Sequence, residues 1–169
     1  MTTVVAYKGF LAHDSRSSYN SGHLATDYTH KSYVNGDLLL ASAGSMGEMQ
    51  AFMREDFTFL DWDNPAFPKK WRKKYLKHIE VMMFKKGHDR FFETTDGLFP
   101  EVRNINDEVA AVSGSGSNFA HSAVHTLSKH STMTPRQIVK ASVEAAIKFD
   151  LHSGGDVLIY NLRTFKCSK

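Results

Sequence analysis

The sequence has a single cysteine, Cys167, and therefore cannot form an intramolecular disulfide bond. This favours a reducing compartment, because disulfide-stabilised folds belong to oxidising ones. The chain starts Met-Thr-Thr-Val-Val-Ala, without the basic segment or the long apolar run of a signal peptide, and we find no stretch that would span a membrane. We therefore expect a cytoplasmic protein with no membrane partner.

The sequence also lacks a large excess of charge of one sign, since the 169 residues carry a formal net charge of only +3. That excess is too small to indicate nucleic acid binding by itself. Hydrophobic residues make up 41% of the chain and charged residues 23%, which is typical of a folded globular protein and not of a disordered one. Because no low-complexity tract marks a linker, we expect residues 1–169 to form one domain.

Two turn signals organise the first part of the chain. β-Branched residues predict a strand over residues 2–7, and Lys8-Gly9 predicts a tight turn into a strand over residues 10–14. Asn35-Gly36 is a strong hairpin signal, because both positions of that turn favour positive φ. It lies between predicted strands over residues 29–34 and 37–43.

The rest of the chain predicts further strands and four helices. We expect strands near residues 79–85, 90–95, 108–113 and 156–162, a turn at Asp96-Gly97, and helices from after Gly47 to about Phe57 and over residues 69–78, 118–129 and 135–149. The last helix begins with a capping box from Thr134 to Gln137, with Pro135 in its first turn. Its apolar stripe is predicted at Ile138, Ala141, Ala145 and Phe149. Strands and helices in this segregated order predict an α+β fold with antiparallel sheets.

Small polar residues and glycine recur at or near the ends of the predicted strands. They are Thr2, Asp14, Lys31, Gly44, Ser115, Asp150 and Ser153. Strand ends are where a layered fold brings together residues that lie far apart in the sequence. We therefore treat this set as a candidate site.

A threonine at the second position could act as a nucleophile that is activated by its own α-amine. Loss of Met1 would give Thr2 both a hydroxyl and a free α-amine, whose unperturbed pKa of about 7.7–8.0 leaves a useful neutral fraction at pH 7. That amine can take the hydroxyl proton and so activate the nucleophile. A nearby buried lysine would lower the pKa of the amine, and an aspartate would keep that lysine charged.

The order of these motifs resembles that of the proteasome β-subunits and the bacterial HslV peptidase. The matching motifs are Thr2-Thr3-Val4-Val5, Asp14, Lys31, Ala43-Gly44, Gly114-Ser115-Gly116-Ser117 and Asp150-Leu151-His152-Ser153-Gly154-Gly155. They cover nearly the whole chain. The Thr-Thr start and the compact length look more like HslV, whereas Asp-x-x-Ser-Gly-Gly looks more like the proteasome β-subunit. The resemblance implies a four-layer α-β-β-α sandwich, the fold of N-terminal nucleophile hydrolases.

The resemblance also implies a threonine-type endopeptidase that hydrolyses peptide bonds. Thr2 would be its nucleophile and the α-amine of Thr2 its base. Lys31 would tune that amine, and Asp14 would support Lys31. The interval from Asp14 to Lys31 is about one residue longer than is usual in this family, so Thr29 or His30 is an alternative to Lys31 in facing the site.

The remaining roles concern the substrate carbonyl and side chain. The resemblance implies that the backbone N–H of Gly44 helps to form the oxyanion hole. A second alignment places Ala41 at that position, but we prefer Gly44 because the family's Ala-Gly element, here Ala43-Gly44, precedes a helix. Ser45 and Met46 would lie near the pocket for the substrate side chain.

Three further residues are implied to surround the nucleophile. Ser115, Asp150 and Ser153 would form a hydrogen-bonded set around the Thr2 amine. All of these roles require the removal of Met1, since a peptide bond to Met1 leaves Thr2 without a free amine.

The resemblance further implies a homo-oligomeric ring of six or seven subunits, which could be stacked, fed with polypeptide substrate by an ATPase ring. We expect no cofactor and no metal. His121 and His125 have the i, i+4 spacing of metal ligands but no clear third partner. The basic segment 69–78 is interpreted as a solvated or subunit-facing helix in preference to a nucleic acid site.

Two other functions remain open. An N-terminal nucleophile amidase could use the same residues on a small amide, although such chains usually carry extra loops that shape a small-molecule pocket. A non-catalytic ring subunit could keep the fold without the activity. The joint presence of Thr2, Asp14, Lys31, Ser115 and Asp150 argues against the second alternative.

Overall fold

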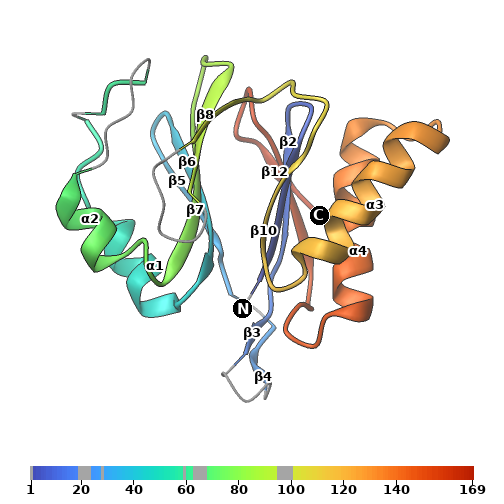
Figure 1. Ribbon diagram of the computed structural model, residues 1–169, viewed down its shortest axis with the longest axis horizontal. Coiled ribbons are helices and arrows are strands. Elements are labelled where there is room, and N and C mark those ends of the chain that lie inside the picture. Colours follow the sequence, from blue (N-terminus) through green and yellow to red (C-terminus); the bar gives the residue numbers. More distant parts are fainter. Residues whose placement is uncertain (1, 19–23, 28, 59, 63–67, 95–100) are drawn as a thin grey trace.

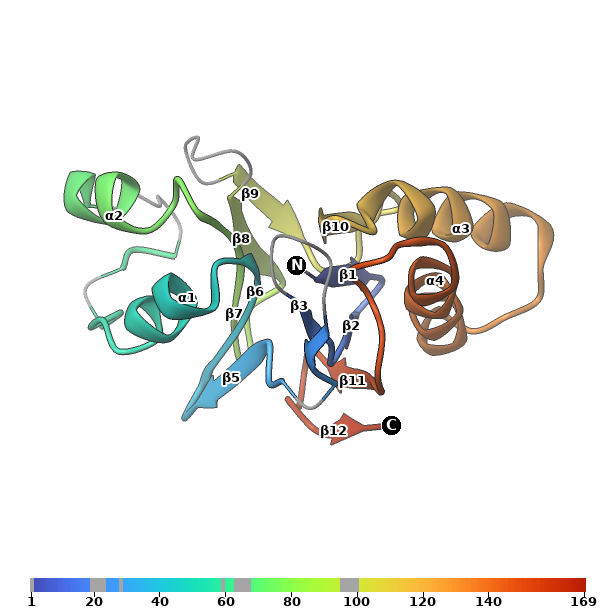
Figure 2. The same ribbon diagram turned by 90° about the horizontal axis from the view of Figure 1, so that it is seen from below.

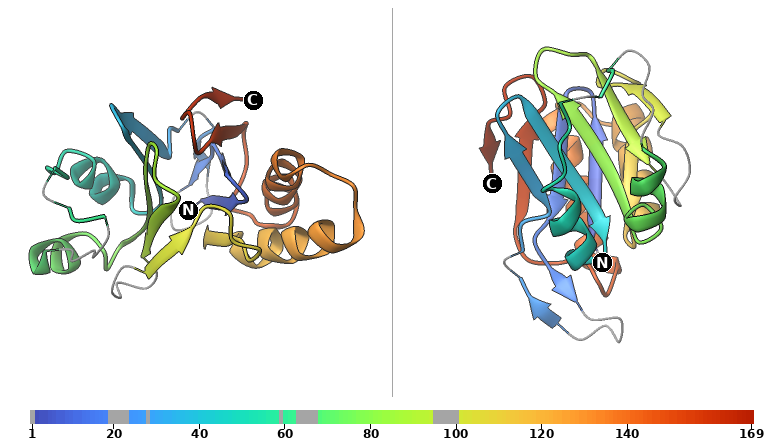
Figure 3. Two further views of the ribbon diagram at one scale, coloured as in Figure 1. Left: turned by 90° about the horizontal axis from the view of Figure 1, so that it is seen from above. Right: turned by 90° about the vertical axis from the view of Figure 1, so that its left-hand side faces the viewer.

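Two five-stranded antiparallel sheets lie face to face in the computed structural model, and a pair of helices covers the outer face of each (Figure 1 and Figure 2). The structure describes residues 2–18, 24–27, 29–58, 60–62, 68–94 and 101–169. The four-layer α-β-β-α sandwich expected from the sequence is therefore confirmed, and the two sheets form its inner layers (Figure 3). Among the described residues, no helix combines the length and the apolar character needed to cross a membrane.

The first sheet holds both ends of the described chain. Its strands, in spatial order, are β10 (Ala111–Gly114), β1 (Thr3–Tyr7), β2 (Phe10–Asp14), β11 (Val157–Asn161) and β12 (Cys167–Ser168). The predicted turn between β1 and β2 is confirmed, with positive φ at Lys8 (42°) and Gly9 (81°). The turn joins the two strands so that Tyr7 pairs with Phe10.

The second sheet is a simple meander in sequence order. Its strands are β5 (Ser32–Asn35), β6 (Leu38–Gly44), β7 (Ile79–Lys85), β8 (Arg90–Thr94) and β9 (Glu101–Asn104). The expected hairpin joins β5 to β6, with Gly36 at φ 59°. A short pair of strands, β3 (Ser17–Ser18) and β4 (Leu24–Thr26), extends below the sandwich (Figure 1).

The helices lie on opposite sides of the sandwich. Helices α1 (Met46–Phe52) and α2 (Lys69–Lys74) cover the second sheet, whereas α3 (Ser117–His130) and α4 (Pro135–Phe149) cover the first (Figure 2). Both short helices end earlier than expected. The capping box of α4 is confirmed, since Thr134 and Gln137 exchange hydrogen bonds as predicted.

Three apolar clusters fill the spaces between the four layers. One lies between the sheets and includes Val4, Leu11, Leu39 and Phe84. The other two lie between each sheet and its helices. Each fully buried aliphatic or aromatic side chain contributes about 1.5–3 kcal/mol, so both faces of each sheet contribute to stability.

Some sequence predictions differ from the structure. The short strands β9 and β12 were not expected, and Lys31 immediately precedes β5 instead of lying within a strand. Of the predicted stripe of α4 only Ile138 is buried, and the other buried residues of this helix are Val139, Ser142, Val143 and Ala146. Phe149 is 62% exposed. The turn predicted at Asp96-Gly97 lies outside the described residues.

Candidate functional site

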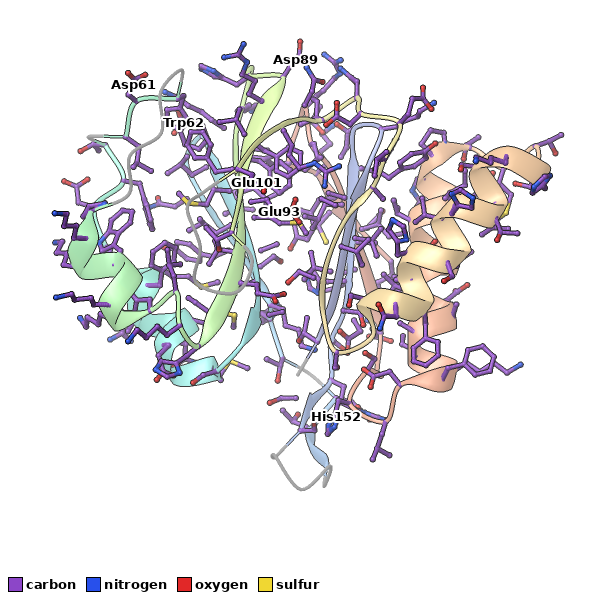
Figure 4. The ribbon with its side chains drawn as sticks, viewed as in Figure 1. Asp61, Trp62, Asp89, Glu93, Glu101 and His152 are labelled. Carbon is purple, nitrogen blue, oxygen red and sulfur yellow. The ribbon has the colours of Figure 1, made fainter. Side chains whose placement is uncertain are left out.

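The strands of the first sheet begin or end with several of the predicted residues, which therefore lie together at one end of the sandwich. β1 begins there with Thr3, β2 ends there with Asp14, and β10 ends there with Gly114, because neighbouring strands are antiparallel. Thr2, which directly precedes β1, is 4% exposed. His152, in the turn that follows α4, lies at this lower edge in Figure 4.

Asp14 and Lys31 form a buried ion pair at this edge. Lys31 Nζ lies 3.0 Å from Asp14 Oδ1, and the two side chains are 3% and 0% exposed. Burial lowers the pKa of Lys31, and the charge of Asp14 partly offsets that effect. Thr29 and His30 are more exposed than Lys31, so Lys31 is the residue of this segment that contacts Asp14.

Backbone donors complete the surroundings of the Asp14 carboxylate. The N–H of Thr3 donates to Oδ1 at 2.8 Å, and the N–H of Gly154 donates to Oδ2 at 2.9 Å. The N–H of Arg16 is a third donor, at 3.3 Å from Oδ2. Asp14 therefore ties the residue after Thr2 to the Ser-Gly-Gly turn and to Lys31.

A second polar network links the ends of β10 and α4. Ser115 Oγ donates to Asp150 Oδ2 at 2.6 Å, and Ser153 Oγ donates to the same oxygen at 2.7 Å. Ser153 Oγ also lies 2.7 Å from Thr3 Oγ1. Because the Ser153 proton is used towards Asp150, Thr3 is the donor in that contact. Burial raises the pKa of Asp150, but the hydrogen bonds from Ser115 and Ser153 outweigh it and the net shift is downward.

Close packing of glycine connects this network to Thr2. Gly114 has φ 94°, and a Cβ placed on it would lie 1.7 Å from the carbonyl oxygen of Thr2. A Cβ on Gly116 would lie 2.1 Å from Thr3 Oγ1. The glycines of the Gly-Ser-Gly-Ser motif therefore allow the β10 end to approach Thr2 and Thr3 directly.

The residues predicted for the substrate carbonyl and side chain lie on the second sheet and α1. Gly44 ends β6 with φ 115°, and a Cβ there would collide with the carbonyl oxygen of His78. Ala41 lies in the middle of β6, fully buried and paired on both sides, so its position suits a strand interior. Ser45 donates to Glu48, and Met46 packs against the cluster beneath α1 and α2.

His13 is a buried polar residue that the sequence analysis missed. It is 0% exposed, with Nδ1 2.9 Å from the carbonyl oxygen of Asp14 and Nε2 2.9 Å from Ser32 Oγ. A carbonyl only accepts, so Nδ1 carries the proton and neutral Nε2 accepts from Ser32. Ser32 Oγ also lies 2.8 Å from the Tyr160 hydroxyl. Burial lowers the pKa of His13 to about 4.

Glu80 is a second residue that the sequence analysis missed, and Thr3 is a third because it was cited only as part of a motif. Glu80 accepts hydrogen bonds from Ser113 Oγ and from the N–H of Gly114, at 3.0 Å for the latter. The available signal was a single ionisable residue within an apolar strand, as at Glu80 in Ile-Glu-Val-Met-Met-Phe and at His13 in Phe-Leu-Ala-His.

Comparisons with known proteins give relatives of this chain but no similar family model. No family model matches the chain. The chain is 31% identical over 182 residues to "ATP-dependent protease subunit HslV" of Campylobacter jejuni subsp. jejuni (strain 81-176), covering 97% of this chain and 94% of the relative. It is 28% identical over 178 residues to the protein of the same name from Sulfurovum sp. (strain NBC37-1), covering 98% and 96%.

Two solved structures share the fold. Eukaryotic HslV from Trypanosoma brucei superposes with a TM-score of 0.69 at 16% identity, covering 94% of this chain and 98% of that one. Thiobacillus denitrificans BPH, solved in complex with epoxomicin, gives a TM-score of 0.66 at 18% identity, covering 96% and 99%. Identities this low support the fold and not the chemistry.

Proposed function

The chain belongs to the family of HslV protease subunits, and on that premise we propose that it is a threonine endopeptidase whose nucleophile is Thr2 once Met1 is removed. The observation that carries this proposal is the buried Lys31–Asp14 pair, with 3.0 Å between charged atoms, directly beside the Thr3 amide. The buried positive charge of Lys31 lies next to the first strand, where it would lower the pKa of a free α-amine on Thr2.

The reaction proceeds through an acyl-enzyme. Thr2 Oγ bonds to the scissile carbonyl carbon while its proton passes to the Thr2 α-amine. The C–N bond of the substrate then breaks, and the leaving amine takes that proton. Water next attacks the ester carbonyl carbon while the α-amine accepts the water's proton. The bond from that carbon to Thr2 Oγ1 then breaks, the carboxylic acid product leaves, and the α-amine returns the proton to Thr2 Oγ1.

Lys31 and Asp14 tune the base. A positive charge at Lys31 disfavours a second positive charge on the Thr2 amine and lowers the pKa of that amine. Burial lowers the pKa of Lys31 and so favours its neutral form, whereas the negative charge of Asp14 raises that pKa and favours the charged form. The pair therefore keeps the amine neutral and ready to accept a proton near pH 7.

Ser115, Asp150 and Ser153 orient the nucleophile, and Gly44 stabilises the transition state. Ser115 and Ser153 both donate to Asp150 Oδ2, and Ser153 also contacts Thr3, the next residue after Thr2. The N–H of Gly44 donates to the developing oxyanion, a contribution of about 10²–10³ in kcat for one donor.

The substrate and assembly follow from the family. The relatives are named ATP-dependent protease subunits, so we propose that this chain cleaves unfolded polypeptides delivered by an ATPase ring. Ser45 and Met46, beside Gly44, contact the substrate side chain. The chain of residues 1–169, once Met1 is removed, acts as one peptidase domain within a cytoplasmic homo-oligomeric ring of six or seven subunits.

Cleavage of an unfolded protein tests the proposal. Protein verified by intact mass to lack Met1 is expected to degrade casein and to cleave fluorogenic peptides. Thr2→Ala protein and protein that retains Met1 are matched controls, and both are expected to be inactive. Cleavage of small amides without degradation of casein would favour the amidase, and activity in the Met1-retaining protein would refute the use of the Thr2 amine.

A further inference from the structure

Glu80 occupies an unusual position on β7. Alternate residues of this strand face opposite ways, with Val81 and Met83 in the cluster beneath α1 and α2 and with Met82 and Phe84 in the cluster between the sheets. By this alternation Glu80 faces the first sheet together with Met82 and Phe84. A carboxylate therefore ends an apolar row at the inner face of the sandwich.

The carboxylate of Glu80 makes a bond across the gap between the two sheets. Its Oε2 accepts from Ser113 Oγ and, at 3.0 Å, from the N–H of Gly114, both at the end of β10. Ser113 is 3% exposed, so the donors face little competition from water. Hydrogen bonds to an ionised acceptor are stronger than those between neutral groups.

Gly114 is the point of closest approach between β10 and Thr2. A Cβ at Gly114 would meet the Thr2 carbonyl oxygen at 1.7 Å and the Cβ of Ala43 at 3.2 Å. Ala43 pairs with Glu80 on the neighbouring strand. One carboxylate is thus fixed beside the Ala43-Gly44 end of β6 and holds the strand end that touches Thr2.

We propose that Glu80 is a positioning residue that fixes the Gly114-Ser115 segment against Thr2 and keeps it in register with Gly44. The proposal rests on the proposed function, because these segments carry the groups that orient the nucleophile and the oxyanion. Without Glu80, the two sheets lose a polar connection at the site, and the Gly114-Ser115 segment keeps only the β1 pairing and the Ser115–Asp150 hydrogen bond to hold it against Thr2. A displacement of about 1 Å in such a site costs up to about 100-fold in rate.

Kinetics on the assembled protein lacking Met1 test this role. Glu80→Ala is expected to lower kcat for a fluorogenic peptide by about 10- to 100-fold with KM changed less than about twofold. Glu80→Gln keeps one oxygen that accepts from Gly114, so it is expected to recover part of the lost kcat. Ser113→Ala, which removes one donor without touching the carboxylate, is expected to fall between wild type and Glu80→Ala.

Glu93 supplies the matched control. It is a buried carboxylate on β8 of the same sheet, 6% exposed and paired with Arg103 at 3.0 Å, and it lies above the labelled His152 in Figure 4. Glu93→Gln is expected to reduce thermal stability and leave kcat unchanged. Wild-type kcat in folded Glu80→Ala protein would overturn the proposal, as would an equal loss of kcat in Glu93→Gln.

Hydrogen exchange separates this proposal from the proposed function. Peptides spanning residues 111–116 are expected to exchange faster in Glu80→Ala than in wild type, because the Gly114 amide loses its acceptor, and to be unchanged in Glu93→Gln. If wild-type protein lacking Met1 shows no peptidase activity, the proposed function fails and exchange alone decides whether Glu80 fixes Gly114. Unchanged exchange in Glu80→Ala would overturn the positioning role in either case.

Discussion

Replacing Asp14 by asparagine keeps the shape of the side chain but removes its charge. Each carboxylate oxygen accepts from at least two donors, Thr3 N–H and Lys31 on Oδ1 and two backbone N–H groups on Oδ2. An asparagine amide has one oxygen, so in either orientation its NH₂ group faces donors. Lys31 also loses its counterion, at 3% exposure.

The expected cost follows from these contacts. Breaking a buried ion pair from one side costs about 3–5 kcal/mol, and in a chain of this size about 1 kcal/mol shifts Tm by about 2–4 °C. Asp14→Asn is therefore expected to lower Tm by about 6–20 °C at pH 7 and to lower kcat by about 100-fold or more, because Lys31 no longer holds a charge near the Thr2 amine.

Thermal unfolding and peptide hydrolysis measure these two effects. A double variant, Asp14→Asn with Lys31→Met, removes both charges and is expected to be more stable than Asp14→Asn alone, since no unpaired lysine remains. Its kcat is expected to stay low. A Tm within about 2 °C of wild type for Asp14→Asn, or additive losses in the double variant, would refute the account of the buried pair.

Three other changes have defined outcomes. Gly114→Ala is expected to abolish peptide cleavage and to lower Tm, because the new Cβ would overlap the Thr2 carbonyl oxygen, and wild-type activity would contradict the packing. Burial lowers the pKa of His13 to about 4. Between about pH 6.5 and 4 the folded state therefore binds fewer protons than the unfolded state. The free energy of unfolding is expected to fall by roughly 3 kcal/mol as the pH decreases through that window. Chemical denaturation at several pH values is expected to show this slope in wild type and a flatter one in His13→Asn. Ser153→Ala is expected to lower kcat by about tenfold with little change in KM, since Asp150 loses one donor, and a change in KM alone would argue against an orienting role.

Local signals in the sequence predicted much of the fold. The Lys8-Gly9 and Asn35-Gly36 turns and the capping box of Thr134 act over a few residues, so they can be identified without knowing the tertiary structure. The buried face of α4 could not be identified this way. Its alanines and valines lie on more than one side, and packing on the first sheet and α3 selects Val139 and Val143.

Some residues of the candidate site could be predicted from the sequence and others could not. The ion pair of Asp14 with Lys31 and the contacts of Asp150 join residues whose motif order was visible in the sequence. Glu80 and His13 act across the space between sheets or between distant strands. Their partners depend on how the two sheets stack, which no local pattern specifies.

The central claim is that one threonine provides both the attacking oxygen and the base. An epoxyketone tests it most directly, because this reagent bonds to both the hydroxyl and the free α-amine of an N-terminal threonine. Protein lacking Met1, treated with epoxomicin and mapped by peptide mass spectrometry, is expected to carry one adduct on Thr2 that blocks both groups, with activity lost in proportion. An active protein with no adduct at Thr2, or an adduct on another residue that abolishes activity, would contradict the account.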